Sequence, residues 1–326
     1  MRPALPDTTP ILPADDADAL AMAAAILAEG GLVAVPTETV YGLAADATQG
    51  EAVAGIYEAK GRPRFNPLIA HVDSVERAAS LIDLPPLGHQ LAKPFWPGPL
   101  TLVAKQKDAS PVSDLAAAGL QTQAVRVPQS AALTRLIAQL DRPVAAPSAN
   151  ASGQISPTRA DHVKASLDGR IHLILDGGPC PVGVESTIVS LIDPDKPALL
   201  RPGGLTRESL EAITGPLGHA NTAATTAPTA PGQLSSHYAP NATVRLNQSA
   251  PSAGEAYLDF GPGRPEFDGP YFNLSKTGSL AQAAANLFTG LRTLDAKAAV
   301  IAVAPISETG LGEAINDRLK RAAAPR

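Results

Sequence analysis

The chain has 326 residues, a formal net charge of −5 with histidine neutral, and a hydrophobic fraction of 44%. This length is compatible with two domains of about 150 residues each. The single cysteine, Cys180, excludes an internal disulfide and a cysteine-cluster metal site, and favours a cytoplasmic protein with an incidental rather than a reactive thiol. The sequence contains no apolar run of about 18 residues, so it predicts no membrane span. A module that binds RNA mainly through phosphates would need a basic stripe, and the sequence contains none. Direct tRNA binding is therefore expected to be weak.

Helical and strand patterns alternate from the N-terminus to about residue 215. Asp15 or Asp16 can cap a first helix that extends through Glu29, and Gly30 can end it. Further helices are predicted at residues 50–59, 74–81, 129–140, 158–167 and 206–214, and strands at 32–35, 68–72, 100–105, 124–127, 144–146, 171–175, 187–192 and 199–201. Several strands adjoin without an intervening helix. We therefore expect an α/β fold of α+β character, with a twisted mixed sheet and helical cover.

A polar loop directly follows the first predicted strand. It reads PTETVYGL at residues 36–43 and carries three hydroxyl groups and a carboxylate. Ligands of α/β proteins collect at strand ends, where loops present polar groups on a rigid base. The alternative is a threonine-rich loop whose hydroxyls satisfy local backbone groups.

A cationic loop at residues 60–68 ends a predicted helix and opens a strand. Lys60, Arg62 and Arg64 lie within five positions, next to Asn66, and two prolines keep the backbone extended. Arginine can bind a phosphate through two hydrogen bonds and lysine supplies a point charge, so the loop suits a phosphate chain. A solvated basic loop is the alternative.

Two further loops combine small and polar residues at strand ends. Residues 144–153 read VAAPSANASG, and residues 183–191 read GVESTIVSL, with Arg201 at the end of the next strand. Small residues let a ligand approach the backbone, while Ser148, Asn150 and Ser156 offer neutral hydrogen bonds. The chain contains no Walker loop, and no GxGxxG follows a strand, so the common nucleotide fingerprints are absent.

Five motifs together resemble the YrdC-type threonylcarbamoyl-adenylate synthase family. They are PTETVYGL (36–43), KxRPxxNPL (60–68), WPGPLT (96–101), APSAN (146–150) and GVESTI (183–188), in that family's order and spacing. The tail motifs SHYAP (236–240) and GEAINDRL (312–319) resemble its longer, two-domain form. The resemblance divides the chain into a catalytic domain at 12–215, a linker or lid at 216–240, and a small C-terminal α/β domain at 241–326.

The resemblance implies synthesis of L-threonylcarbamoyladenylate and pyrophosphate from L-threonine, bicarbonate or carbon dioxide, and ATP. The product would serve downstream proteins that transfer the threonylcarbamoyl group to tRNA. Residues that fall at threonine-binding positions of the family are Thr39, His71, Arg126, Ala146 and Ser186. Those at ATP-binding positions are Arg62, Asn66, Thr122, Ser148, Ser156, Arg201 and Ser235. Lys60, Arg62, Ser148 and Asn150 match the family's catalytic signature.

This chemistry needs no protein nucleophile, and no Ser-His-Asp or Cys-His arrangement emerges from the sequence. The threonine amine can capture carbon dioxide, and the carbamate oxygen can then attack the α-phosphate. Catalysis would consist of positioning and charge stabilisation. Mg²⁺ is expected to bind with ATP, held mostly by phosphate and water, so that few protein carboxylates are required. His71 could act as a base for the amine or as a hydrogen-bonding group of the binding site.

The segment 215–240 is rich in Thr, Ala, Pro and Gly and predicts a linker. Its last part, 231–238, holds a histidine, a tyrosine and several hydroxyls, which either contact a ligand or dock the linker onto a domain. We expect the segment to act as a lid over the substrates, with Ser235 in contact with the nucleotide. After it, strands are predicted at 243–246, 256–260, 271–274 and 299–304, and helices at 279–294 and 311–323. The sequence reveals no chemical constellation in this small domain.

Two other functions are compatible with parts of the pattern. One is a carbamoyl-adenylate-handling enzyme of the hydrogenase-maturation type, which shares the fold. Such an enzyme would carry an acylphosphatase or a zinc-finger module with cysteine pairs, and the single cysteine excludes the zinc finger. The other is an RNA-binding module, against which the net charge and the ligand-like loops count.

Overall fold

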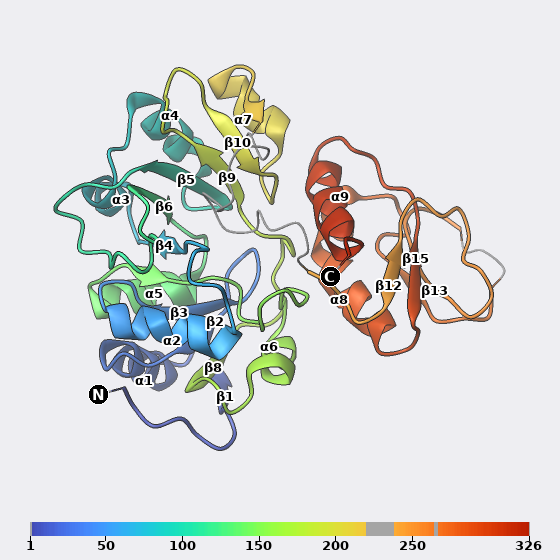
Figure 1. Cartoon of the computed structure of the whole chain (residues 1–326), viewed down its shortest axis with the longest axis horizontal. Coiled ribbons are helices and arrows are strands. Elements are labelled where there is room, and N and C mark those ends of the chain that lie inside the picture. Colours follow the sequence, from blue (N-terminus) through green and yellow to red (C-terminus); the bar gives the residue numbers. More distant parts are fainter. Residues whose placement is uncertain (1, 220–237, 264–266, 326) are drawn as a thin grey trace.

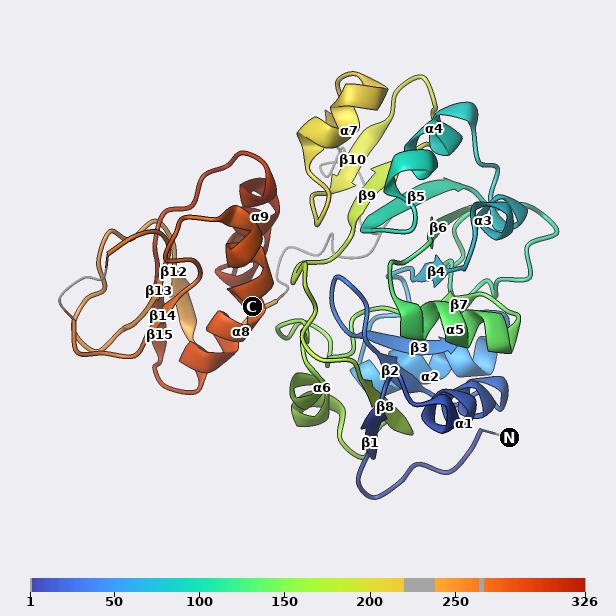
Figure 2. The ribbon, with the colours of Figure 1, turned by 180° about the vertical axis from the view of Figure 1, so that it is seen from behind.

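The computed structural model describes residues 2–219, 238–263 and 267–325. A large N-terminal domain and a small C-terminal domain lie side by side (Figures 1 and 2). No helix in the described part of the chain is both long and apolar enough to span a membrane.

An 11-stranded sheet forms the centre of the large domain. Its strands are β1 (Ile11–Pro13), β2 (Val33–Val35), β3 (Gly42–Asp46), β4 (Ile69–His71), β5 (Leu100–Lys105), β6 (Thr122–Arg126), β7 (Val144–Ala145), β8 (Leu173–Asp176), β9 (Thr187–Ser190), β10 (Ala198–Arg201) and β11 (Gly218–His219). They lie in the order β1-β8-β2-β3-β7-β4-β6-β5-β9-β10-β11. The pairs β4–β6 and β5–β9 are parallel, whereas β3–β7 and β5–β6 are antiparallel. The predicted mixed sheet is therefore confirmed.

Helices cover both faces of this sheet. They are α1 (Ala17–Ala28), α2 (Gly50–Lys60), α3 (Val75–Leu81), α4 (Pro86–Phe95), α5 (Ala131–Leu140), α6 (Ala160–Leu167) and α7 (Arg207–Thr214). Successive side chains of a strand point to opposite faces. Accordingly, Val33 and Val35 of β2 join an apolar cluster with α1 and α5, while Ala34 between them joins the cluster that contains α2. Because both faces of β2 are buried, its sequence is continuously apolar and shows no alternation.

Side-chain caps begin four of the seven helices in the described part of the large domain, including the one for which a cap was predicted. Asp16, one of the two candidates, caps α1 by accepting hydrogen bonds from the backbone N–H groups of Asp18 and Ala19. Ser74, Ser130 and Thr206 cap α3, α5 and α7 in the same way. These side chains satisfy backbone donors that have no partner inside the helix, which fixes where each helix begins.

The sequence patterns missed four elements of the large domain: β1, β3, α4 and β11. The predicted loop at 36–43 in fact ends at Tyr41, because Gly42 already belongs to β3. Strand β3 reads GLAAD, which has low intrinsic strand propensity, and it forms because β2 and β7 pair with it on either side. Helix α4 has Pro86 at its start and Pro94 inside, which hid it from a pattern-based prediction.

The small domain has a parallel four-stranded sheet, in the order β12-β15-β13-β14. Its elements are β12 (Thr243–Arg245), β13 (Ala256–Asp259), β14 (Tyr271–Asn273), α8 (Leu280–Asp295), β15 (Val300–Val303) and α9 (Leu311–Ala322). Helices α8 and α9 lie between this sheet and the large domain (Figures 1 and 2). The small domain's apolar core includes Val40, Ile155 and Val184 of the large domain. The two domains thus share part of one core.

Candidate functional site

One pocket collects residues from six loops or strand ends of the large domain. These six are the loops after β2, α2 and β7, the segment before β9, and the ends of β6 and β10; β4 contributes Ile69 and His71, and Tyr238, which precedes β12, completes the wall. Its lining residues are Thr37, Thr39, Val40, Gly42, Arg62, Ile69, His71, Arg126, Ala146, Pro147, Ser148, Glu185, Ser186, Arg201 and Tyr238. It encloses about 50 Å³, far less than the few hundred Å³ of typical ligand sites. Binding of a nucleotide here therefore requires the walls to move apart.

Arg126 fixes one side of the pocket. Its guanidinium forms a buried ion pair with Glu38 at 2.6 Å and donates to the Thr39 hydroxyl at 3.1 Å. It also donates to the carbonyl oxygen of Gly98 in the WPGPLT segment, at 3.1 Å. Arg126 ends β6 and is paired in register with His71, the last residue of β4. The parallel pairing of these two strands therefore places the guanidinium beside the imidazole.

Arg201 fixes the opposite side. At the end of β10, its guanidinium donates to the carbonyl oxygen of Ser186 at 2.9 Å and to the Ser186 hydroxyl at 3.2 Å. The same hydroxyl lies 2.7 Å from that of Thr101 on β5. A residue larger than glycine at position 203 would collide with the backbone of Glu185 and Ser186, its Cβ coming within 2.3 Å of the Glu185 carbonyl oxygen. The Pro202–Gly203 turn and the GVEST segment are therefore packed directly against each other.

The pocket is strongly cationic. Arg62, Arg126 and Arg201 line it and are all buried, whereas Glu185 is its one carboxylate among the described lining residues. Burial is the main cause that lowers the pKa of Arg62 to about 10; the phenols of Tyr57 and Tyr238 counteract this, and the Arg201 cation adds to it. Buried cations have lost their hydration, and a negative charge nearby compensates for that loss. Because the pocket lining has fewer carboxylates than arginines, it favours an anionic ligand.

His71 is neutral in this pocket. Burial first, and the Arg126 cation second, lower its pKa from 6.5 to about 3. A neutral imidazole can accept or donate a hydrogen bond. However, its low basicity here argues for a binding role over that of a proton acceptor in the empty pocket.

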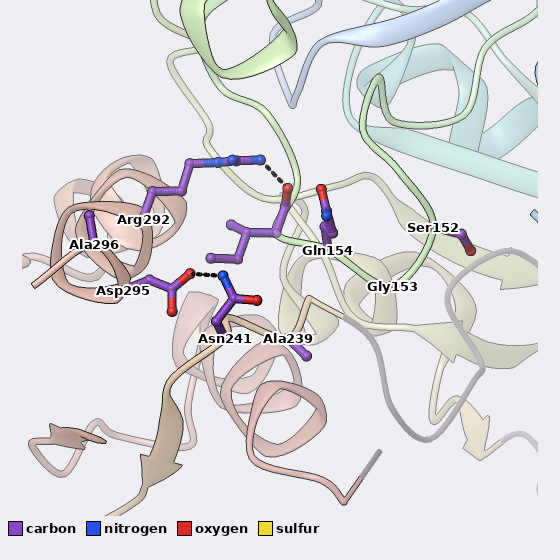
Figure 3. Close-up of a pocket in the computed structure, with 9 residues that line it drawn as sticks. Ser152, Gly153, Gln154, Ala239, Asn241, Arg292, Asp295 and Ala296 are labelled. Carbon is purple, nitrogen blue, oxygen red and sulfur yellow. Dashed lines mark hydrogen bonds between the residues drawn. The ribbon is translucent and has the colours of Figure 1, made fainter. Parts of the chain in front are cut away.

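Larger cavities lie elsewhere and do not combine such groups. One of them, of about 580 Å³, runs along the domain boundary between α8 and the loop that carries Ser152 and Gln154 (Figure 3). Arg292 donates to the carbonyl oxygen of Ile155, and Asn241 donates to Asp295 at 3.2 Å. The first of these bonds joins the two domains, and the second lies within the small domain. The cavity holds one arginine among its described lining residues, whereas the arginine pocket holds three, so the arginine pocket remains the candidate site.

Comparison with known proteins identifies the family. Residues 25–203 match the Sua5/YciO/YrdC family model, described as telomere recombination, and residues 205–324 match the model of the threonylcarbamoyl-AMP synthase C-terminal domain. The threonylcarbamoyl-AMP synthase of Bacillus subtilis is 41% identical, over 94% of this chain and 93% of its own length. The chain belongs to the threonylcarbamoyl-AMP synthase family. It is thus an enzyme of the nucleotidyltransferase type, as the motifs predicted.

Solved structures agree with this assignment. The crystal structure of Pyrococcus abyssi Sua5 in complex with L-threonine superposes with a TM-score of 0.86 at 39% identity, over 93% of this chain and 94% of that one. Full-length HypF, at 20% identity and a TM-score of 0.50, matches 58% of this chain but only 30% of its own. That likeness concerns the fold alone. The hydrogenase-maturation and RNA-binding alternatives therefore receive no support.

Eight residues predicted from the sequence line the pocket together. The five threonine-site residues are all among them, and so are three predicted to bind ATP: Thr39, His71, Arg126, Ala146, Ser186, Arg62, Ser148 and Arg201. Ser156 lies behind the lining, where its hydroxyl donates to Glu185 at 2.6 Å.

Other predicted residues support the pocket loops from behind. The Lys60 ammonium donates to the carbonyl oxygens of Ser148 and Asn150, and burial lowers its pKa, with Arg62 adding to the effect. The Asn150 amide donates to two carbonyl oxygens of its own loop. The backbone carbonyl of Asn66 accepts from Arg62 at 3.3 Å. In this arrangement these residues shape the 146–154 and 62–67 loops.

Three residues singled out in the sequence are not among the lining residues: two lie away from the pocket, and the third is outside the described residues. Thr122 begins β6, at the opposite end of that strand from Arg126. Arg64 is exposed. Ser235 falls outside the described residues, as does most of the predicted lid at 216–240, so both remain predictions.

The sequence interpretation overlooked Glu185 as a pocket residue and left the role of Tyr238 open. Glu185 stood inside the quoted GVESTI motif, but nothing local distinguished its carboxylate from those of surface loops. Tyr238 lines the pocket and also stacks on Phe288 of α8, with ring centroids 5.5 Å apart. It thus combines the two roles, ligand contact and docking, that the sequence left open. Cys180 is buried and its pKa is raised to about 12, mainly by desolvation, which makes it an inert thiol.

Proposed function

We propose that the protein joins L-threonine, bicarbonate or carbon dioxide, and ATP into threonylcarbamoyl-AMP within the arginine pocket. In this reaction the threonine nitrogen bonds to the carbon of carbon dioxide and loses a proton. A carbamate oxygen then attacks the α-phosphorus, and the bond to the β-phosphate oxygen breaks to release pyrophosphate. The observation that carries the proposal is the convergence of three buried arginines with the five predicted threonine-site residues in one pocket.

The threonine side of the pocket is assigned to Thr39, His71, Arg126, Ala146 and Ser186. Arg126 suits the amino-acid carboxylate, because a guanidinium can bind both oxygens in its plane. Neutral His71 and the hydroxyls of Thr39 and Ser186 suit the threonine hydroxyl and the carbamate. Ala146 lines the same pocket and would contact threonine through its backbone.

The nucleotide side is assigned to Arg62, Ser148 and Arg201, with Asn66, Thr122, Ser156 and Ser235 as further proposed contacts. Lys60 and Asn150 hold the Ser148 loop, so their catalytic role would be to position it. Arginines bound through their backbone partners are pre-organised, and such positioning of charge is the main way to catalyse nucleotidyl transfer.

Magnesium would arrive with ATP as part of that substrate. Among the described residues no three acidic, histidine or cysteine side chains form a metal-binding group. Glu185, the carboxylate of the pocket, is bonded through both oxygens to Ser156 and Arg318. We propose that phosphate and water supply most of the ligands of this ion. We further propose that the product passes to tRNA threonylcarbamoyl-transfer proteins in the cytoplasm, with little direct contact between this chain and tRNA.

A direct assay tests the proposal. Pyrophosphate release should require ATP, L-threonine and bicarbonate together, and mass spectrometry should detect threonylcarbamoyl-AMP in the same samples. Pyrophosphate release that does not depend on threonine, or the absence of the acyl-adenylate despite release, would overturn it.

A further inference from the structure

Arg318 of the small domain penetrates the large one. It lies on α9, its side chain is 0% exposed, and it is the bulkiest of the fully buried side chains. Its Nε donates to Glu185 at 3.0 Å, and its Nη1 donates to the carbonyl oxygen of Pro202. Its guanidinium also lies 5.5 Å from the centre of the Tyr238 ring. In Figures 1 and 2, α9 occupies the side of the small domain that faces β9 and β10.

Glu185 connects this arginine to the pocket. Its Oε1 accepts from the Ser156 hydroxyl at 2.6 Å and its Oε2 accepts from Arg318, so both oxygens are engaged. Burial alone would raise the pKa of Glu185, but Arg318, Arg201 and the Ser156 hydroxyl together lower it below its usual value. Glu185 is therefore an ionised carboxylate in the pocket lining, 7% exposed.

An ionised carboxylate is unfavourable in a pocket for anions. A triphosphate must bind beside Glu185, and like charges in a site of low dielectric repel strongly. The large domain offers Arg201 as a cation near Glu185, yet Arg201 is also proposed to bind the nucleotide. The cation that bonds Glu185 directly comes from the small domain.

We propose that Arg318 is a positioning residue for the nucleotide side of the site: it neutralises Glu185, so that the pocket accepts a triphosphate and Ser156 keeps its orientation. This inference rests on the proposed function. It gives the small domain a task in catalysis, because without α9 the pocket would hold a carboxylate whose charge opposes its substrate.

The test measures two dissociation constants by calorimetry on the full chain. The probes are α,β-methylene-ATP, which cannot release pyrophosphate, and L-threonine. In Arg318→Met the nucleotide dissociation constant should rise about tenfold or more, because a buried carboxylate loses its counter-ion next to the phosphates. Threonine carries no net charge, so its affinity should change much less.

A double variant separates charge from structure. If Arg318 acts by neutralising Glu185, then Arg318→Met combined with Glu185→Gln removes both charges and should recover nucleotide affinity to within about threefold of the wild type. A merely structural role predicts no such recovery. Arg207→Gln is the matched control: it breaks another ion pair between the domains, Arg207–Glu313 at 2.6 Å, outside the pocket lining. It should leave both affinities unchanged.

The outcomes are distinct. Unchanged nucleotide affinity in Arg318→Met, failure of the double variant to recover it, or an equal loss in Arg207→Gln would each overturn the proposal. If Arg318→Met does not fold, the nucleotide affinities of the double variant and of Arg318→Lys are measured instead. Both should bind the nucleotide to within about threefold of the wild type, and a tenfold loss in either, with threonine binding intact, overturns it. If the wild-type protein binds the nucleotide but makes no threonylcarbamoyl-AMP, the proposed function fails while these comparisons still decide the role of Arg318.

Discussion

Backbone carbonyl groups aim the three arginines of the pocket. Arg62 donates to the carbonyl oxygens of Asn66 and Pro67, Arg126 to that of Gly98, and Arg201 to that of Ser186. A carbonyl oxygen orients a guanidinium without cancelling its charge. These bonds hold the three side chains in place, which lowers the entropy lost on binding, and Arg126 is held in addition by its buried ion pair with Glu38.

Replacing Arg62 by alanine should weaken nucleotide binding selectively. Loss of a buried charged contact costs about 2–4 kcal/mol, so the ATP dissociation constant should rise about 30-fold or more. Threonine affinity should stay close to that of the wild type, because Arg62 belongs to the nucleotide side. Arg64→Ala is the control, since Arg64 is an exposed arginine on the same loop. Equal effects of the two substitutions would show that only the net charge of the loop matters.

The buried His71 predicts how stability depends on pH. Its folded-state pKa of about 3 lies below the 6.5 of the unfolded chain, so the unfolded state binds the proton more readily. The stabilisation is complete above pH 6.5 and is lost as the pH falls toward 3. Between pH 7 and pH 5 this residue alone should remove about 2 kcal/mol from the free energy of unfolding.

Urea denaturation of the wild type and of His71→Asn at both pH values measures this effect. The variant should lose about 2 kcal/mol less between pH 7 and pH 5 than the wild type, whatever its absolute stability. His162, whose pKa burial and Arg292 lower to about 4, adds a similar dependence that is common to both proteins. Parallel pH profiles would mean that His71 is not buried in its neutral form.

At the scale of elements, the sequence predicted best where local chemistry decides the structure. Helices with capping side chains and strands rich in β-branched residues were predicted to within a few residues, as α5 and β5 show. Strand β3 and helix α4 were missed, because pairing and packing partners far away in the chain stabilise them against weak local propensity. The pocket shows the same division. The motif loops were found, whereas the contact between Glu185 and Arg318, 133 positions apart in the chain, left no local signal in the sequence.

Gly183 marks the closest approach of the two domains. A Cβ at this position would lie 2.4 Å from the carbonyl oxygen of Ala284 on α8, and its backbone φ is +77°. Gly178→Ala provides a matched control, because Gly178 has the same φ of +77° but nothing within 4 Å of its Cβ position. The control should lose about 1–2 kcal/mol of stability for the backbone strain alone.

Gly183→Ala should cost about 1–3 kcal/mol more than the control, because the extra methyl group forces α8 away from the GVEST segment. That displacement should also weaken nucleotide binding, since α9 moves with α8 and Arg318 leaves Glu185. Chemical denaturation and nucleotide titration of the two variants measure these differences. Equal free energies of unfolding for the two variants would mean that the domains can move apart at this point without loss of stability.

At the scale of the whole molecule, the boundary between the domains is built like a protein interior. Val40, Ile155 and Val184 of the large domain pack in the same apolar cluster as Phe288 and Tyr238. The ion pairs Arg318–Glu185 and Arg207–Glu313 cross the same boundary. A small domain of about 85 residues buries a limited core by itself, so these shared contacts should supply a large part of its stability.

We therefore expect the two domains to unfold in one cooperative transition. The chain contains a single tryptophan, Trp96, which is buried in the large domain and donates to the carbonyl oxygen of Leu100, so its fluorescence reports on that domain alone. Far-ultraviolet circular dichroism reports on both domains. The two signals should give the same midpoint in urea, and calorimetry should show equal calorimetric and van't Hoff enthalpies.

In Gly183→Ala the circular dichroism transition should begin at lower urea than the fluorescence transition, because the small domain loses the contacts that couple it to the large one. Separate midpoints in the wild type would show instead that the domains are independently stable, and that the shared apolar cluster contributes little to holding them together.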